Sequence, residues 1–208
     1  MDLIPEENVS PLPMTAEPGT FIRRVVDRIP VQVWREVERA QAGVSPSPEL
    51  FKRLMNTLGP SIAQAFSVRE HEVAILLVKD QGLLLGFAYP FTFYADRKNL
   101  FPVGGPSIAG DVFRTRTGRI DNNLAQIGHL EIYERINVKA QGPLKIQKMI
   151  SAPLLLPDGQ PLGVIQVSRK ATFLGEAGPH FTPADLGRLT DLCAWLAPVI
   201  RSMIPPDY

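Results

Sequence analysis

The stretch ISAPLLLPDGQPLGVIQVSRK (150–170) decides the fold class. Two apolar runs flank Pro157-Asp158-Gly159, three residue types that favour a tight turn, so the pattern predicts a β-hairpin. An earlier hairpin is expected from the β-branched run Glu72–Lys79, which a glycine-containing turn separates from Leu83–Tyr89. The chain therefore contains at least two pairs of antiparallel strands.

A helix is predicted from FTPADLGRLTDLCAWLAPVI (181–200). Thr182 is its expected N-cap, Pro183 suits the first helical position, and Asp185 stands where a capping acid reaches back to the cap. The spacing of the apolar residues predicts that one face of this helix is buried.

A second helix is expected within SIAGDVFRTRTG (107–118), with Ser107 as its cap and Gly118 as its end. A short polar strand, RIDNN (119–123), follows it. Hairpins that alternate with helices in this order predict an α+β fold, in which one antiparallel sheet carries the helices.

The chain divides into three parts by composition. Residues 1–19 hold four prolines and almost no periodicity, so a flexible tail is expected. Residues 20–48 predict an N-terminal helical extension that ends in a linker, and residues 49–208 form the main domain. The first helix of that domain is expected to be interrupted at Gly59-Pro60.

Charge and cysteine content exclude several classes of function. The 208 residues have a net charge of +1 with both signs interspersed, which provides no basic surface for nucleic acid or for a membrane. No uncharged run reaches the ~20 residues that a bilayer requires. Cys193 is the single cysteine, which suits a reducing compartment, so a cytoplasmic location is predicted.

Four short motifs occur in an order that resembles the GAF domain family, a group of PAS-like small-molecule and signal sensors. The resemblance covers roughly residues 49–203, and it rests on these segments: Ser107-Ile108-Ala109-Gly110-Asp111-Val112 with Thr117-Gly118, Ser151-Ala152-Pro153-Leu154, Leu162-Gly163-Val164-Ile165, and Phe181-Thr182-Pro183-Ala184-Asp185-Leu186.

The resemblance implies a sheet of five or six antiparallel strands and a ligand pocket on one sheet face, covered by crossing helices and loops. Carried over by position, the ligand-binding residues would be Tyr89, Phe91, Phe93, Ile108, Asp111, Asn122, Asn123, His129 and Tyr133. Aromatic walls with a few polar groups suit a small-molecule site. The alternative for the phenylalanines is that they simply fill the layer between sheet and helices.

The function expected from this resemblance is a non-enzymatic sensory or regulatory module. It would bind an unidentified small molecule and signal through its terminal helices or a partner protein. A ligand-free dimerisation or docking scaffold is the alternative, and a small enzyme on the same scaffold is the third hypothesis. A homodimer is predicted because apolar faces near both ends could pair: Leu189, Leu192, Leu196, Val199 and Met203, and Trp34 with Val37.

Enzymatic patterns are incomplete. Ser107, Asp158 and His180 follow the order of a hydrolase triad, but Ala109 replaces a glycine of the nucleophile motif. His129-Leu130-Glu131 lacks the cysteine pair of a zinc deaminase, and His71-Glu72 lacks the second histidine of a zinc protease. No metal is therefore predicted, and the cofactor stays unknown.

Special functions within the family can also be compared with single residues. A lone cysteine cannot support thiol exchange within the chain, and Cys193 stands among leucines rather than in the expected pocket. Cyclic-nucleotide binding is in doubt because Leu186 replaces the glutamate of that motif. Lys170 and Asp185 are retained, and they could form a clasp between the hairpin and the final helix.

Overall fold

The computed structural model describes residues 19–93, 100–124, 144–206 and 208. Its centre is one six-stranded sheet in which every neighbouring pair is antiparallel, with the strand order β3-β2-β1-β6-β5-β4. The predicted α+β fold with five or six antiparallel strands is confirmed. The strands are β1 (Val73–Lys79), β2 (Leu84–Tyr89), β3 (Phe101–Pro102), β4 (Arg119–Asp121), β5 (Lys145–Leu155) and β6 (Pro161–Ala171).

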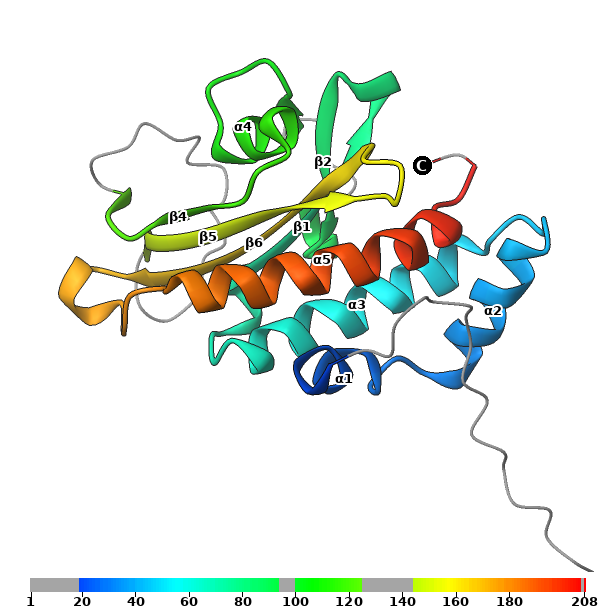
Figure 1. The fold of residues 1–208 in the computed structure, drawn as a ribbon, viewed down its shortest axis with the longest axis horizontal. Helices are drawn as coiled ribbons and strands as arrows, with labels where there is room; N and C mark the ends of the chain where they lie inside the picture. The colour runs from blue at the N-terminus through cyan, green and yellow to red at the C-terminus, as the bar shows by residue number, and fades with distance from the viewer. Residues whose placement is uncertain (1–18, 94–99, 125–143, 207) are drawn as a thin grey trace, which may run out of the picture.

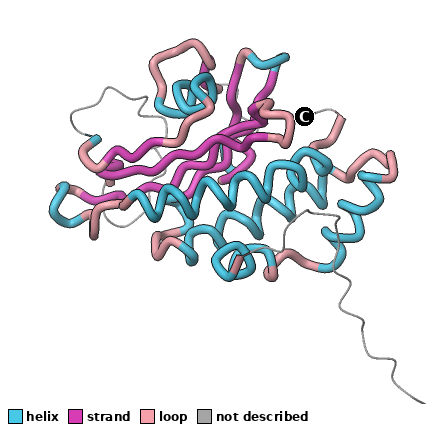
Figure 2. The backbone as a smooth tube through the Cα atoms, in the orientation of Figure 1, coloured by secondary structure: helices cyan, strands magenta, loops and turns pink. Residues whose placement is uncertain are grey.

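Helices cover both faces of the sheet (Figures 1 and 2). The short helix α4 (Ile108–Thr115) lies on one face, and we call this the α4 face. The opposite face carries the larger helical layer, made of α1 (Thr20–Val26), α2 (Val31–Gln41), α3 (Pro48–Ala65) and α5 (Pro183–Met203). No helix in these described ranges is long and apolar enough to cross a membrane.

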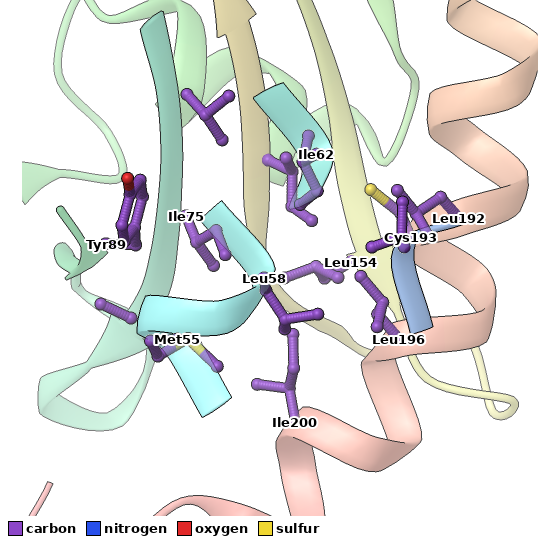
Figure 3. Close-up of a cluster of buried hydrophobic side chains, with 14 of the residues drawn as sticks. Met55, Leu58, Ile62, Ile75, Tyr89, Leu154, Leu192, Cys193, Leu196 and Ile200 are labelled. Atoms are coloured by element: carbon purple, nitrogen blue, oxygen red, sulfur yellow. The ribbon is translucent and has the colours of Figure 1, made fainter. Parts of the chain in front are cut away.

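The larger core lies between the sheet, α3 and α5 (Figure 3). Apolar residues three or four apart on each helix point toward the sheet, as an amphipathic helix requires. They meet strand residues that face the same layer, such as Ile75 and Leu154, and all of these side chains are fully buried. Each such side chain contributes roughly 1.5–3 kcal/mol when it leaves water. The helical members labelled in Figure 3 are Met55, Leu58, Ile62, Leu192, Cys193, Leu196 and Ile200.

The N-terminal helices share this core. Val25 of α1 and Val33 of α2 are fully buried in the same apolar cluster as α3 and α5. The ring of Phe21 meets that of Phe66 edge-on, with 5.2 Å between centroids. The predicted extension at 20–48 therefore exists as helices, and they are packed on the main domain.

The apolar face on which the homodimer prediction rested is not available at the surface. Its α5 members are all fully buried within the chain: Leu189, Leu192, Leu196, Val199 and Met203. Val37 is equally buried, and Trp34 packs edge-on against Trp195 with 6.0 Å between centroids. That reason for dimerisation was wrong, because helices of the same chain cover the face.

Helix α3 runs without interruption through Gly59-Pro60, where the sequence predicted a break. The proline removes one N–H from the helix, and the carbonyl that loses this partner belongs to the exposed residue Asn56. Gly59 has a packing role instead. A methyl group there would lie 2.2 Å from Cζ of Tyr89, so only glycine admits the buried tyrosine ring.

The caps of α4 and α5 mostly agree with the sequence. Ser107 Oγ accepts a hydrogen bond from the Gly110 N–H at 3.0 Å, and Thr182 and Asp185 cap α5 reciprocally. Gly118 does not end α4, which stops at Thr115 with Arg116 in the left-handed conformation. Gly118 is needed for another reason: a methyl group there would lie 2.9 Å from Leu186 of α5.

A buried ionic network joins the start of β1 to the end of β6. The Glu72 carboxylate accepts from the Arg69 backbone N–H and guanidinium, both at 2.7 Å, and from the Lys170 backbone N–H at 2.5 Å. Burial opposes the charge of Glu72, but these hydrogen bonds hold its pKa below the ordinary value. Lys170 Nζ donates to the His71 carbonyl at 2.9 Å. The suggested Lys170–Asp185 clasp is therefore wrong, since Asp185 binds Thr182 and Arg188.

Candidate functional site

The α4 face of the sheet has an apolar half and a polar half. The apolar half surrounds Phe87 and packs under α4 through Ile108, Ala109 and Val112. Phe93 and Phe101 contact the Phe87 ring, with centroids 5.1 and 5.6 Å away. This half of the face is filled by its own side chains.

The polar half consists of two adjacent cross-strand rows. In the first row, Arg119 of β4 pairs with Ser151 of β5, and Ser151 pairs with Gln166 of β6. In the second row, Asp121 and Ser168 flank a methionine of β5. Residues paired across strands point to the same face, and the methionine belongs to the apolar cluster under α4. We call Arg119, Asp121, Ser151, Gln166 and Ser168 the polar strip.

Four of the five members of the polar strip are deeply buried, and the fifth, Arg119, has a side chain that is 36% exposed. Ser151 and Ser168 are fully buried, and Asp121 and Gln166 are only 5% and 6% exposed. Polar groups in such a position are normally hydrogen-bonded, because an unpaired one costs about 1–3 kcal/mol. The partners of each group therefore decide what the strip can do.

The two ionic members of the strip neutralise each other. Arg119 binds Asp121 through two hydrogen bonds, from Nε at 2.8 Å and from Nη2 at 2.5 Å. The hydrogen bonds to Asp121 raise the pKa of Arg119, so the pair stays charged. Asp111 of α4 lies 3.8 Å from the same guanidinium. This contact ties α4 to the edge of the sheet.

Two neutral members of the strip, Gln166 and Ser151, have spare hydrogen-bonding capacity, whereas the third, Ser168, donates through Oγ to the Glu72 carbonyl at 2.9 Å. Gln166 Nε2 donates to Ser151 Oγ at 3.2 Å. Within the described ranges, the other amide atom of Gln166 accepts no hydrogen bond, and the Ser151 hydroxyl donates none. The Gln166 amide oxygen and the Ser151 hydroxyl hydrogen thus have no partner among the described residues, although this oxygen is not one of the fully buried side-chain atoms that lack a partner.

The predicted site residues of α4 and β4 lie around this strip, with different roles. Ile108 is 5% exposed and belongs to the apolar cluster under α4. Asp111 is half-exposed, and it forms ion pairs with Arg114 and Arg119. Asn123 follows β4, is half-buried, and makes no side-chain hydrogen bond to the described residues. Of these three, Asn123 has the amide that is available to a ligand.

The Asn122 side chain is hydrogen-bonded to the backbone just before α5. Its Nδ2 donates to the Phe181 carbonyl at 3.0 Å, and its Oδ1 accepts from the Phe181 N–H at 2.9 Å. Both ends of the amide are used, so Asn122 connects the end of β4 to the residue before the α5 cap. Its place in the structure is that of a connector between the strip and α5.

The three predicted aromatic residues lie apart. Phe93 packs in the apolar half of the α4 face. Tyr89 points into the larger core on the opposite face, because an irregularity in the β1–β2 pairing inserts one extra residue before it. Burial raises the pKa of Tyr89 to about 12. Phe91 lies under the Lys52 ammonium of α3, 4.5 Å from its ring centroid.

His129 and Tyr133, the last two predicted ligand contacts, lie outside the described residues.

The residues of the hydrolase and zinc-enzyme patterns either lie far apart or are engaged in other hydrogen bonds. Asp158 lies in the turn before β6 and His180 beyond its other end, so the 11-residue strand keeps them roughly 30 Å apart. The Ser107 hydroxyl caps α4. Glu72 is bound by Arg69 and Lys170, as described above. No group of three His, Cys, Asp or Glu side chains in the described ranges is placed to hold a metal ion.

Cys193 lies in the larger core beside Leu192 and Leu196 (Figure 3). It is fully buried, its Sγ lies 3.8 Å from the Ala152 carbonyl, and burial raises the pKa of the thiol. A buried neutral thiol is a poor nucleophile.

The sequence reasoning missed Ser151 and Gln166, although a signal for them exists. Positions 164, 166, 168 and 170 share one face of β6, and they read Val, Gln, Ser and Lys in a strand that is otherwise apolar except for Arg169. Polar residues at buried strand positions mark a place where something must satisfy them.

A family model described as "GAF domain" matches residues 48–200. A search of curated protein sequences gave no match.

Solved structures with the same fold share little sequence with this chain. The GAF domain of a phosphoenolpyruvate-protein phosphotransferase from Acinetobacter has a TM-score of 0.54 and 15% identity, over 82% of this chain and 93% of that one. The second GAF domain of DevS from Mycobacterium smegmatis has a TM-score of 0.50 and 17% identity, over 74% and 94%. A type II free methionine-R-sulfoxide reductase from Thermoplasma acidophilum has a TM-score of 0.50 and 13% identity, over 76% and 96%. At these identities the similarity shows the fold alone.

Proposed function

The chain belongs to the GAF domain family, and we propose that it is a non-enzymatic sensory module that binds a small molecule on the α4 face of its sheet. The polar strip is the proposed floor of the site, and Asn123 is a further contact at its edge. His129 and Tyr133 stay part of the proposal on the family resemblance alone.

The observation that carries this proposal is the unsatisfied pair Gln166 and Ser151. Both are at least nine-tenths buried, and together they offer a free acceptor and a free donor. The neighbouring charges of Arg119 and Asp121 are already paired, so the strip offers a neutral surface. It suits a ligand with an uncharged group that both donates and accepts, such as a carboxamide or a hydroxyl.

The proposed output passes through α5. Asn122 connects the end of β4 to Phe181, and Thr182 then caps the helix. A ligand that displaces Asp121 or Asn123 would move Asn122 and with it the start of α5. The signal would then reach a partner protein at the helical layer.

Two alternatives are weaker. A ligand-free docking scaffold would not need an unsatisfied amide in its sheet. An enzyme is conceivable because one structural neighbour is a methionine sulfoxide reductase, but thiol exchange within one chain needs a second cysteine, and Cys193 is the only one. The homodimer and the cytoplasmic location stay predictions, and light scattering that gives about 23.0 kDa would contradict the dimer.

A thermal-shift screen of neutral metabolites tests the proposal. A compound at ~100 times its dissociation constant should stabilise the fold by about 2.7 kcal/mol, which corresponds to a melting shift of roughly 5–10 °C for a domain of this size. Gln166→Leu should abolish the shift and leave the unliganded protein folded. Gln64→Leu, at an exposed position of α3, is the matched control and should keep it.

The outcome against the proposal is equally clear. A compound whose shift survives Gln166→Leu binds somewhere else. If no compound in a broad library shifts the melting point, the sensor proposal fails and the scaffold takes its place.

A further inference from the structure

A groove opens at the end of the sheet that is remote from the ionic network of Glu72. Its walls come from distant parts of the chain: the β1–β2 turn, the β5–β6 turn, α4, and the end of α5 with the residues after it. Its volume is about 720 Å³, within the ~300–1,000 Å³ of small-molecule sites. None of its residues belongs to the polar strip.

The interior of the groove is apolar. Val78, Phe113, Ile204 and Pro205 line it, and Pro205 and Phe113 are buried while the other two are half-buried. Tyr208 forms part of the wall and packs edge-on against Phe51 of α3, with 5.4 Å between ring centroids. An apolar body of a ligand could therefore leave water here.

Two cations lie on the groove. Lys79 Nζ is held 4.1 Å from the centroid of the Tyr208 ring, and burial lowers the pKa of this lysine. Arg201, in the last turn of α5, is exposed, and its guanidinium makes no hydrogen bond or ion pair with the described residues. Among the described side chains that line the groove, these two cations face one carboxylate, that of Asp80.

The turn that forms one wall is held in a costly conformation. Asp80 and Gln81 both have positive φ values, of 47° and 56°, although neither is a glycine. Each such residue costs on the order of 1 kcal/mol, and residues of this kind concentrate at functional sites. Both residues of this turn line the groove.

We propose that this groove is a second binding site, for an amphipathic organic anion whose carboxylate lies at Lys79 and Arg201 and whose apolar body lies along Val78, Phe113 and Ile204. Such a ligand would bridge the end of α5 to both hairpin turns. This site is independent of the proposed sensor site on the α4 face.

Amide chemical-shift mapping of the full chain, titrated with 4-phenylbutyrate and separately with 4-phenylbutanol, tests this proposal. The two probes share an apolar body and differ in charge. The acid should shift the amides of Gln81, Gly82, Gln160 and Arg201 saturably, and it should bind at least about fivefold more tightly than the alcohol, as expected for a partly exposed charge contact.

Variants separate the site from non-specific binding. Arg201→Gln should weaken the binding of the acid roughly three- to fivefold and leave the binding of the alcohol unchanged. Asp80→Asn should strengthen the binding of the acid about twofold, because it removes a negative charge beside the bound carboxylate. Asparagine tolerates the left-handed backbone, so the turn should keep its conformation. Arg53→Gln, an exposed cation of α3 outside the groove, is the matched control.

Equal binding of acid and alcohol would overturn the proposal, as would shifts spread over the surface or an equal effect of Arg53→Gln. Gln166→Leu should leave this titration unchanged. Failure of the sensor proposal and failure of this one are therefore distinguishable.

Discussion

Two buried glutamines of the sheet can be compared directly, because the side-chain amide of one makes two hydrogen bonds to the backbone and that of the other makes a single hydrogen bond to a serine. Gln147 and Gln166 are each 6% exposed, on the neighbouring strands β5 and β6. Gln147 Nε2 donates to the carbonyls of Ala171 and Thr172, at 3.0 and 3.3 Å. Gln166 makes one hydrogen bond, to a serine hydroxyl that can rotate. We predict that leucine at these two positions has different effects on stability.

The expected magnitudes follow from these contacts. Gln147→Leu removes two hydrogen bonds, each worth about 0.5–1.5 kcal/mol, and strips a donor from the carbonyls of buried Ala171 and exposed Thr172, so the loss should be about 1–3 kcal/mol. Gln166→Leu removes one hydrogen bond and an amide oxygen that has no protein partner, and it adds an apolar side chain at a position that is only 6% exposed. The second variant should therefore be as stable as the unaltered chain or more stable.

Urea unfolding followed by tryptophan fluorescence measures both variants, because Trp34 and Trp195 pack against each other in the fold. The difference between the two free energies of unfolding should reach at least about 1 kcal/mol, or roughly 2–4 °C in melting temperature for a domain of this size. If Gln166→Leu loses as much as Gln147→Leu, the amide of Gln166 is a structural group. The reasoning that assigns it to a ligand would then be refuted.

Four further predictions concern the fold. Glu72→Ala breaks a buried ionic network and should cost about 3–5 kcal/mol in urea unfolding, whereas Glu70→Ala, at its exposed neighbour, should stay within about 0.5 kcal/mol. The pKa of Glu72 is lowered in the fold, so this carboxylate stabilises the fold above its ordinary pKa of 4.5, and the stabilisation is lost as the pH falls through the lowered pKa. Glu72→Gln should therefore make the free energy of unfolding depend less on pH in acid. An unchanged pH dependence would contradict this. Gly59→Ala places a methyl group 2.2 Å from a buried tyrosine ring and should cost about 1–3 kcal/mol in melting experiments, while Gly187→Ala, with nothing within 4 Å, should be neutral or stabilising; equal effects would argue against the packing role. Cys193 should react with a thiol reagent only after unfolding, and rapid labelling of the native chain would mean that its core opens.

Local patterns were sufficient to predict most of the fold. The cap residues of α5 and the turn of the β5–β6 hairpin act over a few positions, so their effect is readable from neighbours in sequence. The break predicted at Gly59-Pro60 failed for the opposite reason. Position 59 needs a glycine because the ring of Tyr89 from β2 packs against it, and no local sequence pattern carries information about that contact.

The candidate site was less predictable because its members meet only through strand register. Arg119, Ser151 and Gln166 come from three strands, and their common face follows from the pairing of β4, β5 and β6. Register also sent Tyr89 to the opposite face, through one extra residue in β2. Asn122 and Asn123 were identified together, yet only the structure separates the connector from the available amide.

The most direct test of the account is a crystal structure of the full chain with the compound that gives the largest thermal shift in the metabolite screen. The account predicts that the compound lies on the α4 face, with an uncharged group hydrogen-bonded to the Gln166 amide and the Ser151 hydroxyl. A compound bound elsewhere, with the Gln166 amide enclosed by protein atoms and no space beside it, would contradict the account.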